Sequence, residues 1–317
     1  MLRVMVHGYF GFGNVGDEAI LSVVMDWLRG AFGNVDFIVL SSNPERTRRI
    51  HGVSAIRERL LSPRFWSAFL RSHVIVFAGG GRYGYSTWRR IALLAILARL
   101  LRKVVVFRGI GAYPYEWVGK PVIKEAPEPF RGLTGLLVRA ALNGAVFVSV
   151  RDAYSYAVLR LTGVRHVVIE DDLALRMSVP SPSECGDLAS RYGLVNGKVL
   201  GVNLRTLDET TNRAVIDYVA GLVREFVNRG FTRVVFIPFG FGSFMGRFFD
   251  DDLIIARELK DRVKDLVIIS EELSPRQVLC LFNYLDHVIA MRHHAVIFAL
   301  LARKPLTAII YDTKTLE

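Results

Sequence analysis

Short runs of apolar, often β-branched residues recur along the chain, and each is followed by a segment whose apolar residues repeat at helical spacing. The runs are nearly continuous in hydrophobicity, which is typical of strands buried on both faces of a sheet. Strand and helix therefore alternate through the sequence, and this order predicts an α/β protein with helices on both faces of parallel sheets. The predicted strands begin near residues 2, 35, 73, 104 and 146, and again near residues 198, 233, 266, 287 and 305.

The alternation is interrupted by a Pro- and Ser-rich stretch at residues 177–185. Such a composition suits a linker or a domain boundary. With 317 residues, of which 51% are hydrophobic, the chain is long enough for two domains with cores of ordinary size. We expect two Rossmann-like domains, at residues 1–178 and 179–317.

A glycine-rich turn, GFGNVG, joins the first strand to the first helix at residues 11–16. Rossmann folds bind phosphates at this turn. The helix opens with Asp17 and Glu18, however, and carboxylates at that position repel a phosphate but suit a sugar hydroxyl. The sequence therefore assigns several residues to a sugar acceptor or to the geometry of backbone turns: Gly11, Asn14, Gly16, Asp17 and, in a later glycine turn, Gly80.

Near the carboxyl end, the apolar run at residues 288–291 leads directly into Arg292, His293 and His294 and then into a helical segment. In a parallel sheet this turn lies at the carboxyl edge, where ligands bind, and the helix start adds partial positive charge. Side chains two positions apart share a direction in an extended turn, so Arg292 and His294 are expected to face one pocket. Arg292 can hold an anion with two hydrogen bonds, and His294 can exchange protons. The alternative is a buried histidine beside a surface arginine.

Two further charged positions have more than one interpretation. Arg151 follows a predicted strand and precedes Asp152, the expected N-cap of the next helix. Its guanidinium either projects over the ligand edge or forms a structural ion pair. Three consecutive aspartates at residues 250–252 lack further ligands at suitable spacing, so a solvated first helical turn is favoured over a metal site, and no metal is predicted.

The two cysteines, Cys185 and Cys280, lie far apart and have no histidine at metal-ligand spacing. This pattern predicts neither a disulfide framework nor a zinc site, and it fits a reducing, cytoplasmic setting. The N-terminal apolar segment is too short for a signal peptide. Charged residues interrupt the longest apolar runs before they reach the ~20 residues that a membrane-spanning helix needs.

The formal net charge of +11 is unevenly distributed. Residues 1–176 contain 24 Lys and Arg against 13 Asp and Glu, whereas residues 177–317 contain 17 of each. The excess suits an anionic membrane or a phosphorylated carrier, and equally a basic surface that is only solvated. Nucleic acid is not favoured as a partner, because the basic clusters lack the interleaved aromatic residues on which bases stack.

Several motifs, in this order, resemble those of the polysaccharide pyruvyl transferase family, in its CsaB-like branch, over nearly the whole chain. GYFGFGNVGDEAIL at residues 8–21 is similar to the family's opening motif, and SVRD at residues 149–152 to its arginine motif. MRHHA at residues 291–295 is similar to its Met-Arg-Leu-His-Ala signature, and YDTK at residues 311–314 to its terminal Tyr-Asp-Pro-Lys. The resemblance extends to AGGG, RGIG, GVNLR, FIPF and ELSPRQV.

The resemblance implies two Rossmann-like domains arranged as in GT-B glycosyltransferases, with a cleft between them. It also implies an enzyme that transfers pyruvate from phosphoenolpyruvate to two hydroxyls of a sugar, forming a cyclic ketal without a cofactor. The acceptor would be a cell-surface polysaccharide or its lipid-linked precursor, in the cytoplasm or at the inner face of the membrane. His294 and Arg292 would form the catalytic pair, while Arg151, Arg292 and Lys314 would hold the donor.

The sequence departs from the family pattern in several places. His293 replaces a leucine and Thr313 a proline, and the GGGRYGY segment carries more charge and aromatic character than is usual. Family members usually continue through another helical segment after the YDTK motif, so this sequence is consistent with a shortened chain. Two other functions fit the same fold, namely a GT-B nucleotide-sugar glycosyltransferase and a non-catalytic glycan-binding protein.

Overall fold

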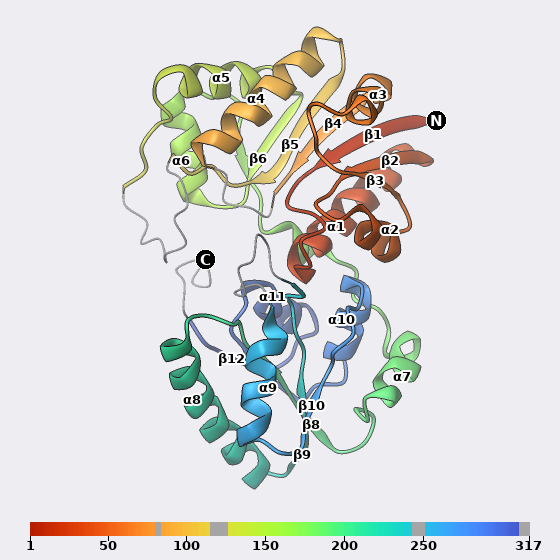
Figure 1. The fold of residues 1–317 in the computed structure, drawn as a ribbon, viewed down its shortest axis with the longest axis vertical. Coiled ribbons are helices and arrows are strands. Elements are labelled where there is room, and N and C mark those ends of the chain that lie inside the picture. The colour runs from red at the N-terminus through yellow and green to blue at the C-terminus, as the bar shows by residue number, and fades with distance from the viewer. Residues whose placement is uncertain (80–83, 115–125, 243–250, 311–317) are drawn as a thin grey trace. The chain divides into compact units, whose positions relative to one another are not determined.

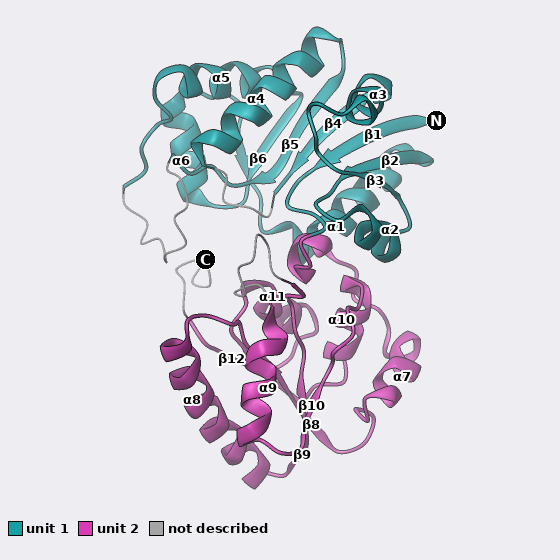
Figure 2. Cartoon of the chain, viewed as in Figure 1, with its two compact units in different colours: residues 1–11, 20–176, 317 teal, residues 12–19, 177–316 magenta. Residues whose placement is uncertain are grey.

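The computed structural model describes residues 1–79, 84–114, 126–242 and 251–310, and the chain divides into two compact units (Figures 1 and 2). Unit 1 comprises residues 1–11 and 20–176 among those described, and unit 2 comprises residues 12–19 and the described residues from Met177 onward. The sequence-based division at residues 178/179 placed residues 12–19 in the first half, and in this respect the structure differs. The glycine turn and the first residues of the following helix group with the second unit.

Unit 1 contains one sheet of seven parallel strands in the order β3-β2-β1-β4-β5-β6-β7. The strands are β1 (Leu2–His7), β2 (Val35–Leu40), β3 (Ser54–Ile56), β4 (Val74–Ala78), β5 (Val104–Ile110), β6 (Phe147–Val150) and β7 (Val168–Ile169). The helices that connect them are α1 (Val15–Phe32), α2 (Pro44–His51), α3 (Pro63–Arg71), α4 (Tyr85–Leu100), α5 (Gly132–Asn143) and α6 (Ala153–Thr162), and a 3-10 helix follows at Leu173–Arg176. Side chains of α3 to α6 form one core against the sheet, around residues such as Phe107 and Trp88.

Unit 2 contains a second parallel sheet, of five strands in the order β10-β9-β8-β11-β12. Its strands are β8 (Lys198–Asn203), β9 (Phe231–Phe236), β10 (Leu266–Ile268), β11 (His287–Ala290) and β12 (Leu306–Ala308). Its helices are α7 (Pro182–Arg191), α8 (Glu209–Asn228), α9 (Asp252–Arg262), α10 (Pro275–Phe282) and α11 (His293–Leu301). In both sheets the strand order reverses beside the first strand of the unit, between β1 and β4 and between β8 and β11. Ligands of open α/β sheets bind at the carboxyl edge of such a reversal.

The Pro- and Ser-rich stretch is only partly the linker that its composition predicted. Residues from Pro182 onward form α7, which begins with a capping box in which Ser181 and Glu184 hydrogen-bond across the first turn. Pro182 occupies the first helical turn, where its missing N–H costs nothing. The Ser-x-x-Glu spacing is the sequence signal for this helix, and the high Pro and Ser content obscured it. The equivalent capping box predicted at Ser274 is confirmed at the start of α10.

The prediction of two separate cysteines is wrong, because Cys185 and Cys280 form a disulfide. Cys185 lies on α7 and Cys280 on α10, and both side chains are buried. Packing of the two helices brings together residues that are 95 positions apart in the sequence. Cysteine usage therefore does not indicate a reducing compartment.

Reduction of this disulfide is expected to destabilise unit 2 by about 2–4 kcal/mol, because the unfolded chain loses a large closed loop. The measurement is denaturant unfolding followed by circular dichroism, with and without a phosphine reductant. Cys185→Ser is the matched control, and reductant should leave its unfolding unchanged. An unfolding midpoint of the native chain that ignores the reductant would contradict a structural role for the disulfide.

Candidate active site

The Arg292–His294 turn lies at the strand-order reversal of unit 2, where the ends of β8 and β11 are neighbours. Asn203, the last residue of β8, fixes this turn from two sides. Its carbonyl oxygen accepts the Met291 N–H at 2.9 Å, and its side-chain oxygen accepts the Arg292 N–H at 3.1 Å. Its side-chain amide donates to the Ile237 carbonyl oxygen at 2.8 Å. One fully buried amide thus sets the position of the backbone from which α11 starts.

The Arg292 guanidinium is held by Asp252 at the start of α9. Arg292 Nε lies 2.7 Å from Asp252 Oδ2, and Arg292 Nη2 lies 2.6 Å from Asp252 Oδ1. Asp252 Oδ2 also accepts the backbone N–H groups of Phe239 and Gly240, at 2.9 and 2.8 Å. Asp252 is fully buried and Arg292 is nearly so. Asp252 and Arg292 therefore form a buried, bidentate ion pair, and the two backbone N–H groups donate further hydrogen bonds to the carboxylate.

Burial raises the pKa of the Asp252 carboxyl above its ordinary value, and the Arg292 guanidinium together with the backbone amides opposes this rise. The groups that bond the carboxylate are all donors, so they stabilise its ionised form. A protonated Asp252 would direct a hydrogen towards one of these donors. The geometry therefore fits a carboxylate.

Asp252 was expected to lie in a solvated helical turn, and that expectation is wrong for this residue. Ile255, Ala256 and Leu259 follow it at helical spacing and are all buried, so Asp252 lies on the inward stripe of α9. Its neighbour Asp251 caps the helix, with its carboxylate accepting the Leu253 N–H at 3.0 Å. The periodicity of α9 is the signal that could have identified Asp252 as an inward-facing residue. From the sequence, the Arg292 guanidinium was expected to bind the anionic groups of the donor. In the structure the guanidinium binds the Asp252 carboxylate.

His294 is buried in the first turn of α11 and packs against the glycine turn. A Cβ atom added to Gly16 would lie 2.0 Å from His294 Nδ1 and 2.2 Å from its Cγ. Only glycine leaves space for the imidazole ring at this point. His293, which the sequence predicted to face elsewhere, is less buried, and its ring meets that of His294 edge-on with centroids 5.3 Å apart.

Backbone hydrogen bonds attach the glycine turn to the strand end that holds Asp252. The Val15 N–H donates to the Phe239 carbonyl oxygen at 2.9 Å, and the Phe241 N–H donates to the Gly13 carbonyl oxygen at 2.8 Å. Asn14 and Gly240 form an antiparallel bridge between these bonds. Residues 239–241 therefore connect the glycine turn to the Asp252–Arg292 pair. His294 packs against Gly16 of the same turn.

The residues assigned to the acceptor fall into two places. Asn14 lies before α1, where its side-chain oxygen accepts the Gly16 N–H at 3.0 Å, and Asp17 is buried in the first turn of the helix. Both belong to unit 2. Gly11 belongs to unit 1 and has a φ of 79°, and an added Cβ would lie 2.1 Å from Ser41 Oγ, so its geometry is that of a backbone turn. Gly80 lies outside the described residues.

Arg151 lies in unit 1, after β6, among acidic and phenolic groups. Its side chain is 5% exposed, and its Nε lies 3.8 Å from Asp152 Oδ2, which also accepts the Tyr113 hydroxyl at 3.0 Å. Burial alone lowers the pKa of Arg151, but Tyr113, Asp172 and Asp152 outweigh this effect, so its pKa is raised and the guanidinium stays charged. Asp152 caps α6 as predicted, accepting the Ser155 N–H at 2.6 Å. The structure thus shows Arg151 in the ion-pair arrangement.

Lys314, the third residue assigned to the donor, lies outside the described residues. Among the residues that the structure describes, no group of three or more His, Cys, Asp or Glu side chains is placed to hold a metal ion. Within the same residues, every helix is too short or too polar to cross a bilayer.

The sequence matches a known protein family, and the fold is similar to those of solved structures. The sequence model of the polysaccharide pyruvyl transferase family matches residues 14–313. Among curated proteins, none matches the sequence. The fold is similar to that of UDP-GlcNAc 2-epimerase from Methanocaldococcus jannaschii, with a TM-score of 0.60 and 11% identity over 100% of this chain and 91% of that one.

Two further structures have the same fold. UDP-GlcNAc 2-epimerase from Neisseria meningitidis, solved with bound UDP-GlcNAc, has a TM-score of 0.57 and 11% identity over 99% of this chain and 84% of its own. A glycosyltransferase from Rickettsia africae has a TM-score of 0.54 and 10% identity over 97% of this chain and 79% of its own. These similarities confirm the expected α/β fold with two Rossmann-like units. At such identities they carry no information about the reaction.

Proposed function

This chain belongs to the polysaccharide pyruvyl transferase family, and we propose that it transfers pyruvate from phosphoenolpyruvate to two hydroxyls of one sugar, forming a cyclic ketal and releasing phosphate. The acceptor is a cell-surface polysaccharide or its lipid-linked precursor. The observation that carries the proposal is His294, a buried imidazole fixed between the start of α11 and Gly16. It is a proton-transfer group in a rigid setting at the ligand edge of a parallel sheet.

The proton balance of ketal formation suits one histidine. A proton added to the methylene carbon of the donor makes a methyl group and leaves an oxocarbenium-like centre at the neighbouring carbon. The first sugar hydroxyl bonds to this centre, phosphate leaves, and the second hydroxyl bonds in its place. Of the two hydroxyl protons, one replaces the proton given to the methyl group and the other leaves with phosphate. His294 can therefore act as acid and then as base without net gain of a proton.

In this proposal cationic side chains hold the donor. The family resemblance assigns Arg151, Arg292 and Lys314 to its phosphate and carboxylate, and we keep these roles, for Arg151 in addition to its ion pair with Asp152. Asp252 bonds Nε and Nη2 of Arg292, and we keep from the family resemblance the proposal that Arg292 also contacts phosphoenolpyruvate. The reaction needs neither a redox group nor a carrier, and we propose no cofactor.

The acceptor side of the proposal uses the glycine turn. Asn14 and Asp17 offer oxygen acceptors that suit sugar hydroxyls, and Gly16 lets the turn approach His294. Since these residues and His294 belong to the same compact unit, the acceptor hydroxyls and the proton-transfer group would meet within that unit. We propose a cytoplasmic enzyme in contact with the inner face of an anionic membrane, where a lipid-linked acceptor would be carried.

Phosphoenolpyruvate is expected to stabilise the protein against heat. A ligand at 100 times its dissociation constant contributes about 2.7 kcal/mol to the free energy of unfolding, which is readily measured as a rise in Tm. The experiment compares phosphoenolpyruvate, inorganic phosphate, and the nucleotide sugars UDP-GlcNAc and UDP-glucose in differential scanning calorimetry.

The outcome separates three functions. Stabilisation by phosphoenolpyruvate beyond that by phosphate supports pyruvyl transfer. Stabilisation only by a nucleotide sugar would point to a glycosyltransferase instead, and no response to any donor would favour a glycan-binding protein that lacks the chemistry.

A further inference from the structure

Residues 57–64 of unit 1, RERLLSPR, comprise a turn and the first two residues of α3, and we refer to them as the leucine tip because they present two leucines to solvent. Leu61 is 99% exposed and Leu60 is 40% exposed. The turn is fixed by the Ser62 N–H, which donates to the Arg59 carbonyl oxygen at 2.8 Å, and by the Trp66 indole N–H, which donates to the Leu60 carbonyl oxygen at 2.6 Å. Leu61 therefore adds almost nothing to the core, and the backbone around it keeps it outside.

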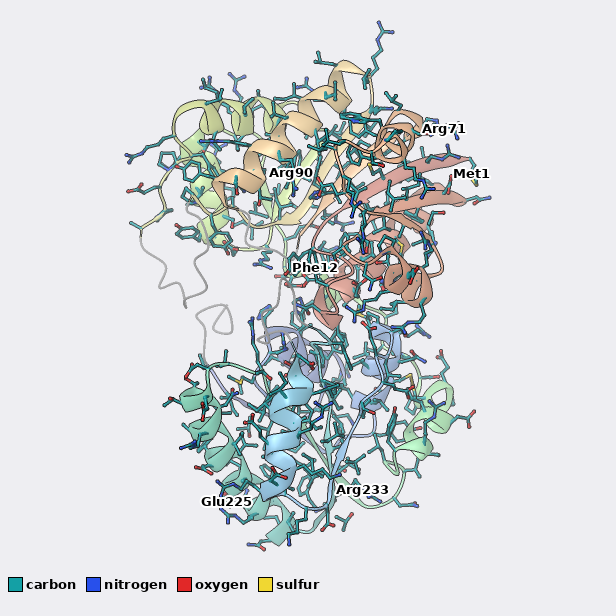
Figure 3. The ribbon with its side chains drawn as sticks, viewed as in Figure 1. Met1, Phe12, Arg71, Arg90, Glu225 and Arg233 are labelled. Carbon is teal, nitrogen blue, oxygen red and sulfur yellow. A yellow bond between two sulfur atoms is a disulfide. The ribbon has the colours of Figure 1, made fainter. Side chains whose placement is uncertain are left out.

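The acidic and basic side chains of the leucine tip differ in exposure. Glu58, its one acidic residue, is turned inward, with His7 Nε2 at 3.1 Å and Arg90 Nε at 3.4 Å from its carboxylate oxygens (Arg90 is labelled in Figure 3). Arg57, Arg59 and Arg64 are exposed. The outer face of the tip therefore presents leucine side chains and cations.

The cationic character continues along the chain. From Arg59 to residue 115 the sequence contains ten Lys and Arg residues and not one Asp or Glu. Exposed leucines followed by so long a run of charges of one sign are unusual for a segment that is only solvated, because solvated surfaces normally mix charges. A second copy of the chain is not the expected occupant, since a symmetric contact through this face would bring like charges together.

The leucine tip lies at the carboxyl edge of the unit 1 sheet. β3 ends at Ile56, so the tip leaves the carboxyl edge of the unit 1 sheet. The contact between Glu58 and His7, the last residue of β1, sets the tip beside the strand that leads into the glycine turn. A surface bound by the tip would therefore lie next to the edge at which ligands of such sheets bind.

We propose that the leucine tip is a membrane anchor: Leu60 and Leu61 enter the interfacial layer of an anionic lipid bilayer, while Arg57, Arg59 and Arg64 contact lipid phosphates. Basic surfaces with exposed apolar side chains bind membranes in this way, by apolar burial and by charge. The inference rests on the proposed function for its purpose, which is to bring the enzyme to an acceptor carried on lipid. The binding itself needs no pyruvyl transfer.

The test is co-sedimentation of the full chain with vesicles of phosphatidylcholine alone or mixed with phosphatidylglycerol, at low and high salt. Leu60→Gln with Leu61→Gln should lower the partition coefficient on the anionic vesicles by about tenfold or more. Loss of the three arginines, each changed to glutamine, should lower it about a hundredfold at low salt and leave the weak binding to neutral vesicles unchanged.

Matched controls use equally exposed residues elsewhere in unit 1. Leu100 and Leu133 are 76% and 66% exposed, and changing both to glutamine should leave vesicle binding within about twofold of the native chain. For charge, the control removes Arg71, labelled in Figure 3 on α3, together with Arg99 and Arg139. These changes should weaken vesicle binding less than loss of the tip arginines.

Equal binding of the tip variants and the native chain would overturn the proposal, as would an equal loss in the leucine control. So would a tip variant that binds vesicles normally but changes sedimentation mass in solution, because the tip would then contact protein. Phosphate release with phosphoenolpyruvate and a short soluble acceptor, measured without vesicles, tests the proposed function separately. The leucine-tip variants should retain that activity.

Discussion

Replacing His294 with alanine is expected to lower the turnover number by ~10²-fold or more while leaving the affinity for phosphoenolpyruvate largely unchanged, because a proton-transfer group acts mainly in the transition state. The ring is buried against Gly16 and forms part of the packing, so thermal unfolding of the variant must be measured first. The assay then pairs calorimetric titration of phosphoenolpyruvate with the rate of phosphate release on an acceptor sugar.

His293→Leu is the matched control for this prediction. It changes the neighbouring ring, 5.3 Å away between centroids, and restores the residue that the family usually has. Both donor affinity and turnover should stay close to native. Full turnover in His294→Ala, or its loss in His293→Leu, would show that the wrong histidine had been assigned to the reaction.

Removing Asp252 should destabilise unit 2 by about 3–5 kcal/mol, because Asp252→Ala leaves the Arg292 guanidinium buried without its carboxylate. Asp251→Ala is the control on the same helix turn. Asp251 is half-buried and serves as an N-cap, so its loss should cost only about 1 kcal/mol. Similar losses for the two variants would contradict the importance of the buried pair.

The chain offers a way to assign this loss to one unit. All four tryptophans precede Met177 and lie outside residues 12–19, so tryptophan fluorescence follows the unfolding of unit 1. Circular dichroism follows both units. In Asp252→Ala the circular dichroism transition should move to lower denaturant while the fluorescence transition moves less.

Arg292→Lys tests the partner, because it keeps the charge but loses the planar fork. It should weaken donor binding as well as stability.

Local features of the sequence were sufficient for the fold and for much of the candidate site. Apolar runs predicted the parallel strands, and short polar spacings predicted the caps at Asp152 and Ser274. The turn that carries Arg292 and His294 was placed correctly after a buried strand, because strand, turn and helix are adjacent in sequence. The catalytic and binding roles of these residues stay predictions.

Pairings between distant residues were not predictable in this way. Asp252 and Arg292 are 40 positions apart, and Cys185 and Cys280 are 95 apart. The periodicity of α9 indicates that Asp252 faces inward, but only the tertiary packing shows that its partner is Arg292. Likewise nothing in the glycine turn itself reveals that its backbone bonds with residues 239–241.

The attachment of residues 12–19 to unit 2 has a consequence for biosynthesis. These residues are translated well before their hydrogen-bond partners Phe239 and Phe241, which lie more than 220 residues behind them. At roughly 5–20 residues per second, the nascent turn waits for about 11–45 s before its partners have been translated. During this time only the part of α1 from Ile20 onward, which belongs to unit 1, can reach its native packing. The glycine turn that packs against His294 therefore acquires its native surroundings late, and the candidate site is assembled only after translation has passed residue 294.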